Sequence, residues 1–178
     1  MLKKLFIIIL GIMCVVMVKP VKKATASSSK FITIETSKGK VLIETFPKIA
    51  PNHVKRIKEL VKQGFYDGII FHRVIEGFMA QTGDPDGNGT GGSGKNLKAE
   101  FSDYEYKYGT VGMARSMNPD SGDSQFFICF DSAPHLDRQY SAFGKVIKGM
   151  EFVDMITKGD GDNGAVSNPD KIISFKSQ

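Results

Sequence analysis

The sequence is poor in cysteine, with only Cys14 and Cys129 among its 178 residues. Cys14 lies in an N-terminal stretch that has the features of a removable leader. With that stretch removed a single thiol remains, so no disulfide can form within the chain. We therefore expect packing alone to stabilise the fold, even in an oxidising compartment.

The usual signatures of metalloenzymes and hydrolases are also missing. The three histidines, His53, His72 and His135, do not have the spacing of metal ligands. The chain contains no Gly-x-Ser-x-Gly nucleophile elbow. The sequence thus gives no support to either class, and we expect no metal and no cofactor.

Surplus charge is confined to the N-terminus. The chain carries 24 basic and 19 acidic side chains, and residues 1–26 contain five lysines and no acid. The remainder therefore has 19 of each sign and is formally neutral. Nucleic-acid binding that is independent of sequence needs a concentrated positive field, so we expect no nucleic-acid partner.

Residues 1–26 have the pattern of a secretory signal. Lys3 and Lys4 precede an uncharged run over residues 5–18, which as a helix would span about 21 Å, short of the ~30 Å hydrocarbon core. Ala24-Thr25-Ala26 supplies a small-x-small cleavage site. We expect cleavage there, a polar linker over 27–30, and export to the periplasm, the cell surface or the medium. The basic stretch 19–23 leaves an alternative open, in which residues 5–18 stay as an uncleaved membrane anchor.

The remaining 152 residues have the size of one domain. A helix is predicted from Pro51, with an apolar stripe and a stop at Gly64, and a short one over Met150 to Ile156. The other periodic segments predict strands: Phe31–Thr36, Val41–Phe46, Ile69–Ile75, Phe78–Gln81, Val111–Ala114, Gln125–Phe130, Tyr140–Ile147 and Lys171–Lys176. About eight strands with two helices indicate a mainly β fold, a closed antiparallel barrel, over residues 31–178.

A glycine-rich stretch over residues 83–94 matches three short motifs incompletely. Gly87-x-Gly89-x-x-Gly92 fits a dinucleotide fingerprint, but no helix pattern follows. Residues 89–95 resemble a phosphate loop without its final hydroxyl residue. Residues 84–89 fit the front half of a calcium loop, but the closing carboxylate position is Lys95. We interpret the stretch as a long, flexible surface loop.

Two segments carry the functional signal. The first is Phe71-His72-Arg73-Val74-Ile75-Glu76-Gly77-Phe78-Met79-Ala80-Gln81-Thr82-Gly83-Asp84. The second is Met113-Ala114-Arg115, followed by Gln125-Phe126-Phe127-Ile128. Strand alternation sends Gln125, Phe127 and Cys129 to one face and Phe126, Ile128 and Phe130 to the other. One set can fill a barrel while the other lines an outer surface suited to an extended peptide with an apolar ring.

These segments, with Phe46-Pro47-x-x-Ala50-Pro51 and Phe143-Gly144-x-Val146, resemble the cyclophilin family of peptidyl-prolyl cis–trans isomerases. The resemblance covers Phe31 to about Phe175. It implies an eight-stranded barrel capped by two helices, and an enzyme that speeds isomerisation of X-Pro bonds without a cofactor. It also implies proline-containing polypeptides as partners, and we expect the protein to work as a monomer in the folding of exported proteins.

The resemblance also assigns site residues. It makes Arg73 the catalytic side chain and Gln81 the partner that orients it. Substrate-binding positions are implied at Phe78, Met79, Ala114, Arg115, Gln125, Phe127, His135, Leu136 and Tyr140. Among these, Phe78, Met79, Phe127 and Leu136 form the proline pocket, and Arg115 acts through its backbone.

Several positions depart from the family pattern. His135 replaces a common tryptophan, Tyr140 a common histidine, Arg115 a common asparagine and Glu76 a proline. Because His135 and Tyr140 belong to the peptide-binding surface, we expect weak affinity for cyclosporin-type inhibitors.

Two other functions remain to be weighed. One is a proline-peptide-binding chaperone or scaffold module without turnover, and Arg73 and Gln81 argue against it. The other is a ligand-carrying barrel, which needs a hollow interior. The many interior Phe and Ile candidates favour a filled one.

Overall fold

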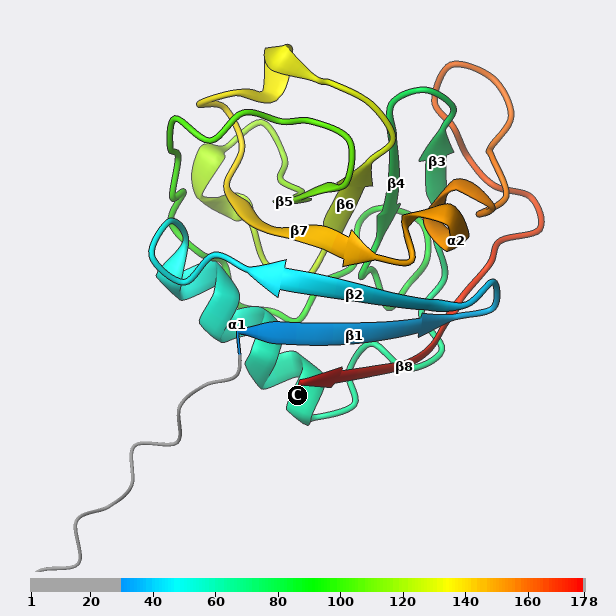
Figure 1. Ribbon diagram of the computed structural model, residues 1–178, viewed down its shortest axis with the longest axis horizontal. Helices are drawn as coiled ribbons and strands as arrows, with labels where there is room; N and C mark the ends of the chain where they lie inside the picture. The colour runs from blue at the N-terminus through cyan, green and yellow to red at the C-terminus, as the bar shows by residue number, and fades with distance from the viewer. Residues whose placement is uncertain (1–29, 178) are drawn as a thin grey trace, which may run out of the picture.

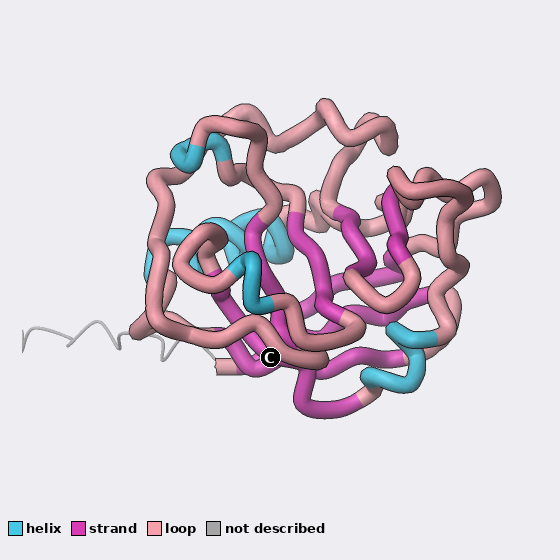
Figure 2. The backbone as a smooth tube through the Cα atoms, turned by 90° about the horizontal axis from the view of Figure 1, so that it is seen from above, coloured by secondary structure: helices cyan, strands magenta, loops and turns pink. Residues whose placement is uncertain are grey.

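The computed structural model describes residues 30–177, which form one eight-stranded sheet with two α-helices (Figure 1). All strand pairs are antiparallel. The elements are β1 (Phe31–Thr36), β2 (Lys40–Thr45), α1 (Pro51–Lys62), β3 (Arg73–Ile75), β4 (Met79–Thr82), β5 (Thr110–Met113), β6 (Phe126–Cys129), β7 (Ala142–Lys148), α2 (Met150–Asp154) and β8 (Ile172–Ser177). Two 3₁₀ turns, η1 (Pro119–Ser121) and η2 (Pro134–Leu136), lie in the loops. A view at right angles shows the strands gathered inside a frame of loops (Figure 2).

The sheet is curled but open, so the predicted closed barrel is wrong in that respect. Its strand order is β3-β4-β6-β5-β7-β2-β1-β8, and the outer strands β3 and β8 do not pair with each other. Irregular backbone lies between these two edge strands instead, in a region called the seam here. The amide of Val74 donates to the carbonyl of Gly164 (2.7 Å), and the amide of Phe71 donates to the carbonyl of Asp170 (2.9 Å).

This seam also explains why the predicted strand 69–75 is shortened to β3. Ile70 pairs with Lys171 through an isolated bridge, whereas Arg73 pairs with Ala165 through another. The segment thus changes partner within a few residues, and a continuous ladder cannot form. The other predicted strands and both helices are confirmed, with ends that shift by one or two residues.

Helix α1 lies against the sheet as its sequence predicted. Pro51 stands in its first turn, and the buried stripe contains Val54, Ile57, Leu60 and Val61. Gln63 caps the helix and Gly64 follows with a left-handed φ of 68°, so the predicted stop is confirmed. The helix packs on β7 and β8. Neither α-helix in residues 30–177 combines the length and apolar character needed to cross a membrane.

The interior of the curled sheet is filled. Phe126 is fully buried at its centre, with its ring near those of Tyr66, Phe143 and Phe175 at centroid distances of 5.7–6.0 Å. Ile128 belongs to the same inner core, whereas Phe127 and Cys129 belong to a separate apolar cluster on the other face. The predicted alternation along β6 is therefore confirmed. The packed interior excludes a ligand-carrying barrel.

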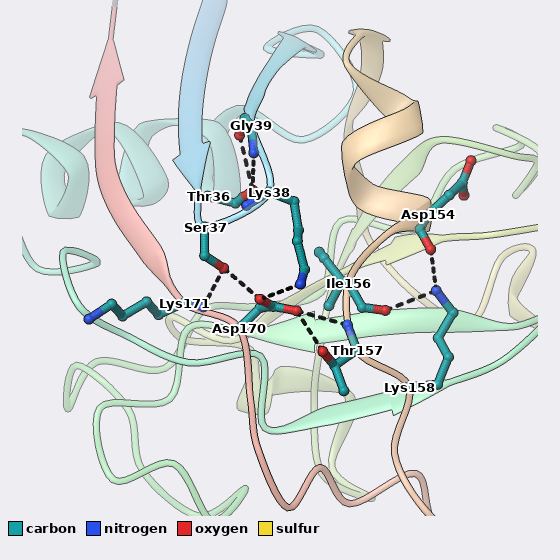
Figure 3. A network of polar contacts seen from close by, with 10 residues as sticks. All are labelled: Thr36, Ser37, Lys38, Gly39, Asp154, Ile156, Thr157, Lys158, Asp170 and Lys171. Atoms are coloured by element: carbon teal, nitrogen blue, oxygen red, sulfur yellow. Dashed lines mark hydrogen bonds and ion pairs between the residues drawn. The ribbon is translucent and has the colours of Figure 1, made fainter.

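A carboxylate ties three parts of the chain together at the seam (Figure 3). Asp170, just before β8, accepts hydrogen bonds from the Ser37 hydroxyl (2.7 Å) and from the Thr157 amide and hydroxyl (2.8 and 2.9 Å). Lys38 Nζ lies 3.2 Å away. Burial raises the pKa of Asp170, but these bonds outweigh burial and the net pKa is below its usual value.

We predict that Asp170→Asn lowers the free energy of unfolding at pH 7 by about 1–3 kcal/mol, because it weakens bonds to an ionised acceptor. A group whose folded pKa is depressed stabilises the fold above its unfolded pKa and loses that contribution as the pH falls. The difference in the free energy of unfolding between wild type and variant should therefore shrink below about pH 4. Urea unfolding across this range measures it, with Asp162→Asn, an exposed acid of the same segment, as the control. Equal stability of Asp170→Asn and wild type at pH 7 would contradict this role.

Candidate functional site

The outer face of β3, β4 and β6 brings the predicted residues into one row. Arg73 on β3 pairs with Gln81 on β4, and Gln81 pairs with Phe127 on β6. Phe127 in turn pairs with Gly112 on β5. Directly paired residues of antiparallel strands project on the same side of the sheet. The row therefore places a guanidinium, an amide and an aromatic ring side by side.

A chain of hydrogen bonds fixes the polar half of this row. Arg73 Nη1 donates to Gln81 Oε1 (3.2 Å), and Gln81 Nε2 donates to Gln125 Oε1 (2.8 Å). Gln125 Nε2 donates in turn to the carbonyls of Gly91 (2.8 Å) and Gly89 (3.1 Å). Each amide thus has one orientation, and the chain of bonds ends on the glycine-rich loop.

A second bond holds Arg73 from the opposite side. Its Nε donates to the carbonyl of Asn163 (3.0 Å), in the segment that fills the seam. Gly164 lets that segment approach closely, since it has a φ of 68° and a Cβ there would lie 2.8 Å from the Val74 carbonyl. Nη2 of the half-buried Arg73 has no hydrogen-bond partner among residues 30–177. One edge of the guanidinium is therefore free to donate to a ligand.

The apolar half is the outer apolar cluster, the group of side chains around Phe127. Met79, Phe127 and Leu136 are 5% exposed or less, whereas Phe78, Ala114 and Tyr140 are partly exposed at its rim. Its buried members are Met79, Tyr106, Phe127, Cys129, Ala133, Leu136 and Ala142, and its partly buried members are Ile75, Phe78, Tyr104, Ala114 and Tyr140.

Phe127 is held from behind and from one side. The buried ring of Tyr106 stacks on it at a centroid distance of 5.9 Å, and Tyr140 meets it edge-on at 5.8 Å. This packing requires glycine at 112, because a Cβ there would lie 2.5 Å from Phe127 and 2.7 Å from Tyr106. Burial raises the pKa of the Cys129 thiol to about 12, so it stays protonated within the cluster.

The positions that depart from the family pattern lie at the rim of the cluster. His135, in η2, is exposed, and its ring centroid lies 5.2 Å from that of Phe78. The guanidinium of Arg115 lies 4.5 Å from the Tyr140 ring centroid. Arg115 also donates from Nε and Nη2 to the carbonyl of Gln139. The family resemblance implied only a backbone role for Arg115, whereas its side chain forms part of the rim. Glu76 is exposed in the turn before Phe78.

The glycine-rich loop is organised by a residue that the sequence reasoning treated only as a possible ion ligand. Asp84 is buried, and its carboxylate accepts hydrogen bonds from the amides of Asp86 (2.8 Å), Asn88 (3.0 Å) and Gly89 (2.5 Å). Burial raises the pKa of Asp84, but the backbone bonds outweigh it and the net pKa is lowered. The stretch is a loop, as predicted, and these three bonds join Asp84 to the backbone of its first turn. An aspartate followed by glycines at turn positions is the sequence signal that could have revealed the role of Asp84 in organising the loop.

The loop borders a cavity of about 520 Å³ next to the row, here called the loop cavity. Gln81, Ala114, Arg115 and Gln125 line one side and residues 89–94 much of the other. Within residues 30–177, no group of three or more His, Cys, Asp or Glu side chains could hold a metal ion. The predicted site residues thus lie in the hydrogen-bonded row, in the outer apolar cluster or at its rim, with the guanidinium of Arg73 at the β3 end of the row.

Comparison with known proteins identifies the family. The family model described as "Cyclophilin type peptidyl-prolyl cis-trans isomerase/CLD" matches residues 31–177. A probable peptidyl-prolyl cis-trans isomerase of Brucella abortus is 51% identical over 84% of this chain and 83% of its own. Peptidyl-prolyl cis-trans isomerase B of Bacillus subtilis is 42% identical, over 68% of this chain and 85% of its own.

Solved structures give the same assignment. A cyclophilin-type isomerase of Cryptosporidium parvum, crystallised in the presence of the dipeptide Ala-Pro, has a TM-score of 0.77 and 30% identity. The match covers 83% of this chain and 98% of that one. A cyclophilin of Hirschia baltica has a TM-score of 0.75, 29% identity and coverage of 84% and 74%. The chain therefore belongs to the cyclophilin family and is a peptidyl-prolyl cis–trans isomerase.

Proposed function

We propose that Arg73 is the catalytic side chain and that Gln81 orients it, while the outer apolar cluster holds the proline ring. The observation that carries this proposal is the bonded chain from Arg73 through Gln81 to Gln125, which lies directly beside Phe127. A guanidinium held at both ends keeps its free edge in one direction. The free Nη2 edge is the donor that acts on the substrate.

The chemistry needs little more than such a donor. Rotation about a peptide bond is opposed by amide resonance, with a barrier of about 18–20 kcal/mol. As the X-Pro bond twists, the proline nitrogen becomes pyramidal and gains a lone pair. A hydrogen bond from Arg73 to that lone pair exists only in the twisted state, so it lowers the barrier rather than merely binding the substrate.

The energies involved are consistent with one charged donor and one anchored ring. A rate gain of about 10⁵ needs roughly 7 kcal/mol of preference for the twisted state. A charge-assisted hydrogen bond in a site with little water contributes part of it. The cluster around Phe127 contributes the rest by fixing the proline ring while the preceding residue rotates. Neither step requires a nucleophile or a cofactor.

Proline-containing polypeptides are the proposed partners. The C. parvum relative was crystallised with a dipeptide that ends in proline, which supports this substrate class. Gln125, Ala114 and the backbone of Arg115 border the row and supply polar contacts for an extended chain. Because all these residues belong to one chain, a monomer suffices. The fixed Arg73 argues against a binding module without turnover.

We also propose that the protein assists the folding of exported proteins. Support comes from residues 1–26, whose basic start, apolar run and small-x-small site have the pattern of a secretory signal. These residues and most of the linker 27–30 lie outside the described residues.

We predict that Arg73→Ala and Arg73→Lys each lower kcat/KM for a proline peptide by at least ~10²-fold, the effect of losing one preorganised donor. Lysine keeps the charge but lacks the planar fork that bonds Gln81 and Asn163 at once. Peptide affinity should fall less than turnover, since the apolar cluster remains. Isomerisation assays, peptide titration and thermal midpoints measure these effects.

Arg138→Gln is the matched control for this experiment, because the side chain of Arg138 is 74% exposed and forms an ion pair with the exposed Asp103. It should retain normal turnover. A folded Arg73→Ala protein with near-normal kcat/KM would rule out the mechanism.

We predict that cyclosporin inhibits the protein weakly, and that His135→Trp makes inhibition about three- to tenfold stronger. His135 already lies against Phe78, so an indole there offers a larger face for packing and retains an N–H donor. His135→Ala should weaken inhibition further. Titration of the three proteins with cyclosporin provides the measurement, and inhibition that does not depend on residue 135 would refute the prediction.

We predict that the exported protein begins at Ser27. N-terminal sequencing of the secreted and membrane fractions identifies the first residue. Ala26→Phe removes the small residue at the cleavage site and should block processing. An intact Met1 on wild-type protein in the membrane fraction would instead establish the anchor.

A further inference from the structure

A second cavity, of about 320 Å³, lies between residues 52–59 of α1 and residues 95–98. It is called the basic cavity here because four of its eight lining residues are cationic and one is acidic. The lining residues are Asn52, Lys55, Arg56, Glu59, Lys95, Asn96, Leu97 and Lys98. The chain from Ser27 onward is formally neutral, so this concentration of positive charge is a local feature.

The lysines of the basic cavity are available to a ligand. Lys95 and Lys98 are exposed and form no ion pair within residues 30–177. Lys55 lies 3.9 Å from Glu59, but both side chains are exposed (75% and 41%), so this pair is weak. The field at the mouth of the cavity is therefore positive.

A buried guanidinium adds to this field from behind. The side chain of Arg56 is only 12% exposed and donates to the Ser93 hydroxyl. Its nearest carboxylate, that of Asp123, is 3.8 Å away, and its buried Nε has no hydrogen-bond partner. Asp123 itself accepts hydrogen bonds from the amides of Gly94 and Lys95. Arg56 is therefore linked to Asp123 both by this long ion pair and through the Ser93 hydroxyl, and its Nε alone has no hydrogen-bond partner.

Two further carboxylates near this wall, those of Asp120 and Glu100, are already engaged. Asp120 accepts a hydrogen bond from the amide of Ala99 (2.9 Å). Glu100 accepts hydrogen bonds from the amides of Asn52 and His53, both at 3.1 Å, and from the side chain of Asn52 at 2.7 Å. It therefore caps α1 from outside the basic cavity's lining. Among the residues that line the basic cavity, an acidic ligand would meet four cations and only Glu59 as a like charge.

The basic cavity continues the groove of the catalytic site. The loop cavity shares Gln81 and Gln125 with the hydrogen-bonded row, and it shares Asn96 with the basic cavity. Gly94, which lines the first cavity, directly precedes Lys95 of the second. A polypeptide held at Arg73 that crosses the loop cavity in an extended form, at about 3.3 Å per residue, leads to the basic cavity.

We infer that the basic cavity is a subsite for an acidic segment of the client polypeptide, a few residues from the isomerised proline. The inference rests on the proposed function, because the client must be held at Arg73 and Phe127. Charge complementarity identifies the occupant as acidic, and continuity with the catalytic groove identifies it as part of the same chain. Clients that carry Asp or Glu at this distance are isomerised in preference to neutral ones.

The test uses peptides with one X-Pro bond and an Asp-Glu pair placed roughly two to six residues before or after it, the range that an extended chain covers across the loop cavity. Neutral Asn-Gln peptides are the reference. At low salt, kcat/KM should be about three- to tenfold higher for the acidic peptide on one side and at one spacing, as two partly exposed ion pairs allow. Salt at about 0.5 M should remove the preference.

Lys95→Gln/Lys98→Gln should abolish the preference and leave kcat/KM for the neutral peptide unchanged. Lys145→Gln/Lys148→Gln, a matched pair of exposed lysines on β7, should retain it. Equal preference on both sides of the proline, or a preference that survives the first double variant, would overturn the inference. The inference would also be overturned if the protein bound phosphatidylserine vesicles through Lys95 and Lys98 but did not discriminate between the acidic and the neutral peptides. Absence of turnover on the neutral peptide would instead overturn the proposed function.

Discussion

The antiparallel register of β3, β4 and β6 is the constraint on which the site depends. It places Arg73, Gln81 and Phe127 in one row, while Val74, Ala80 and Ile128 form the next row on the buried face. A slip of one residue would send the guanidinium into the inner core and the apolar side chains to solvent. The burial of Val74, Ala80 and Ile128 opposes that slip, so the packing of the core also fixes the geometry of the site.

The open seam of the sheet has a functional consequence. Because β3 has no strand on its outer side, the segment around Asn163 and Gly164 lies there and bonds both the β3 backbone and Arg73. A closed barrel would place a regular strand at this edge. The irregular segment instead supplies a carbonyl that points at the guanidinium. The departure from the predicted closed barrel therefore contributes to the orientation of Arg73.

Local patterns in the sequence were sufficient to predict most of the elements and the two faces of β6. The stripe of α1 and the alternation of Phe126 and Phe127 are properties of neighbouring residues, so periodicity reveals them. The contact between Arg73 and Asn163 could not be predicted in this way, because it joins residues far apart in the sequence and its acceptor is a backbone carbonyl, which every residue carries. The stacking of Tyr106 under Phe127, with Gly112 beside it, depends on a loop path that no local pattern encodes.

In the proposed mechanism Gln81 acts on the reaction through Arg73, and a double-mutant cycle of these two residues measures that dependence. Turnover of one proline peptide is measured for wild type, Arg73→Ala, Gln81→Ala and the double variant. If Gln81 only orients the guanidinium, Gln81→Ala should lower kcat/KM by about tenfold in wild type, as the loss of one orienting hydrogen bond of about 1.4 kcal/mol allows, and should have no further effect once Arg73 is alanine. An equal loss in both backgrounds would show that the two residues act independently, and would contradict this account of the site.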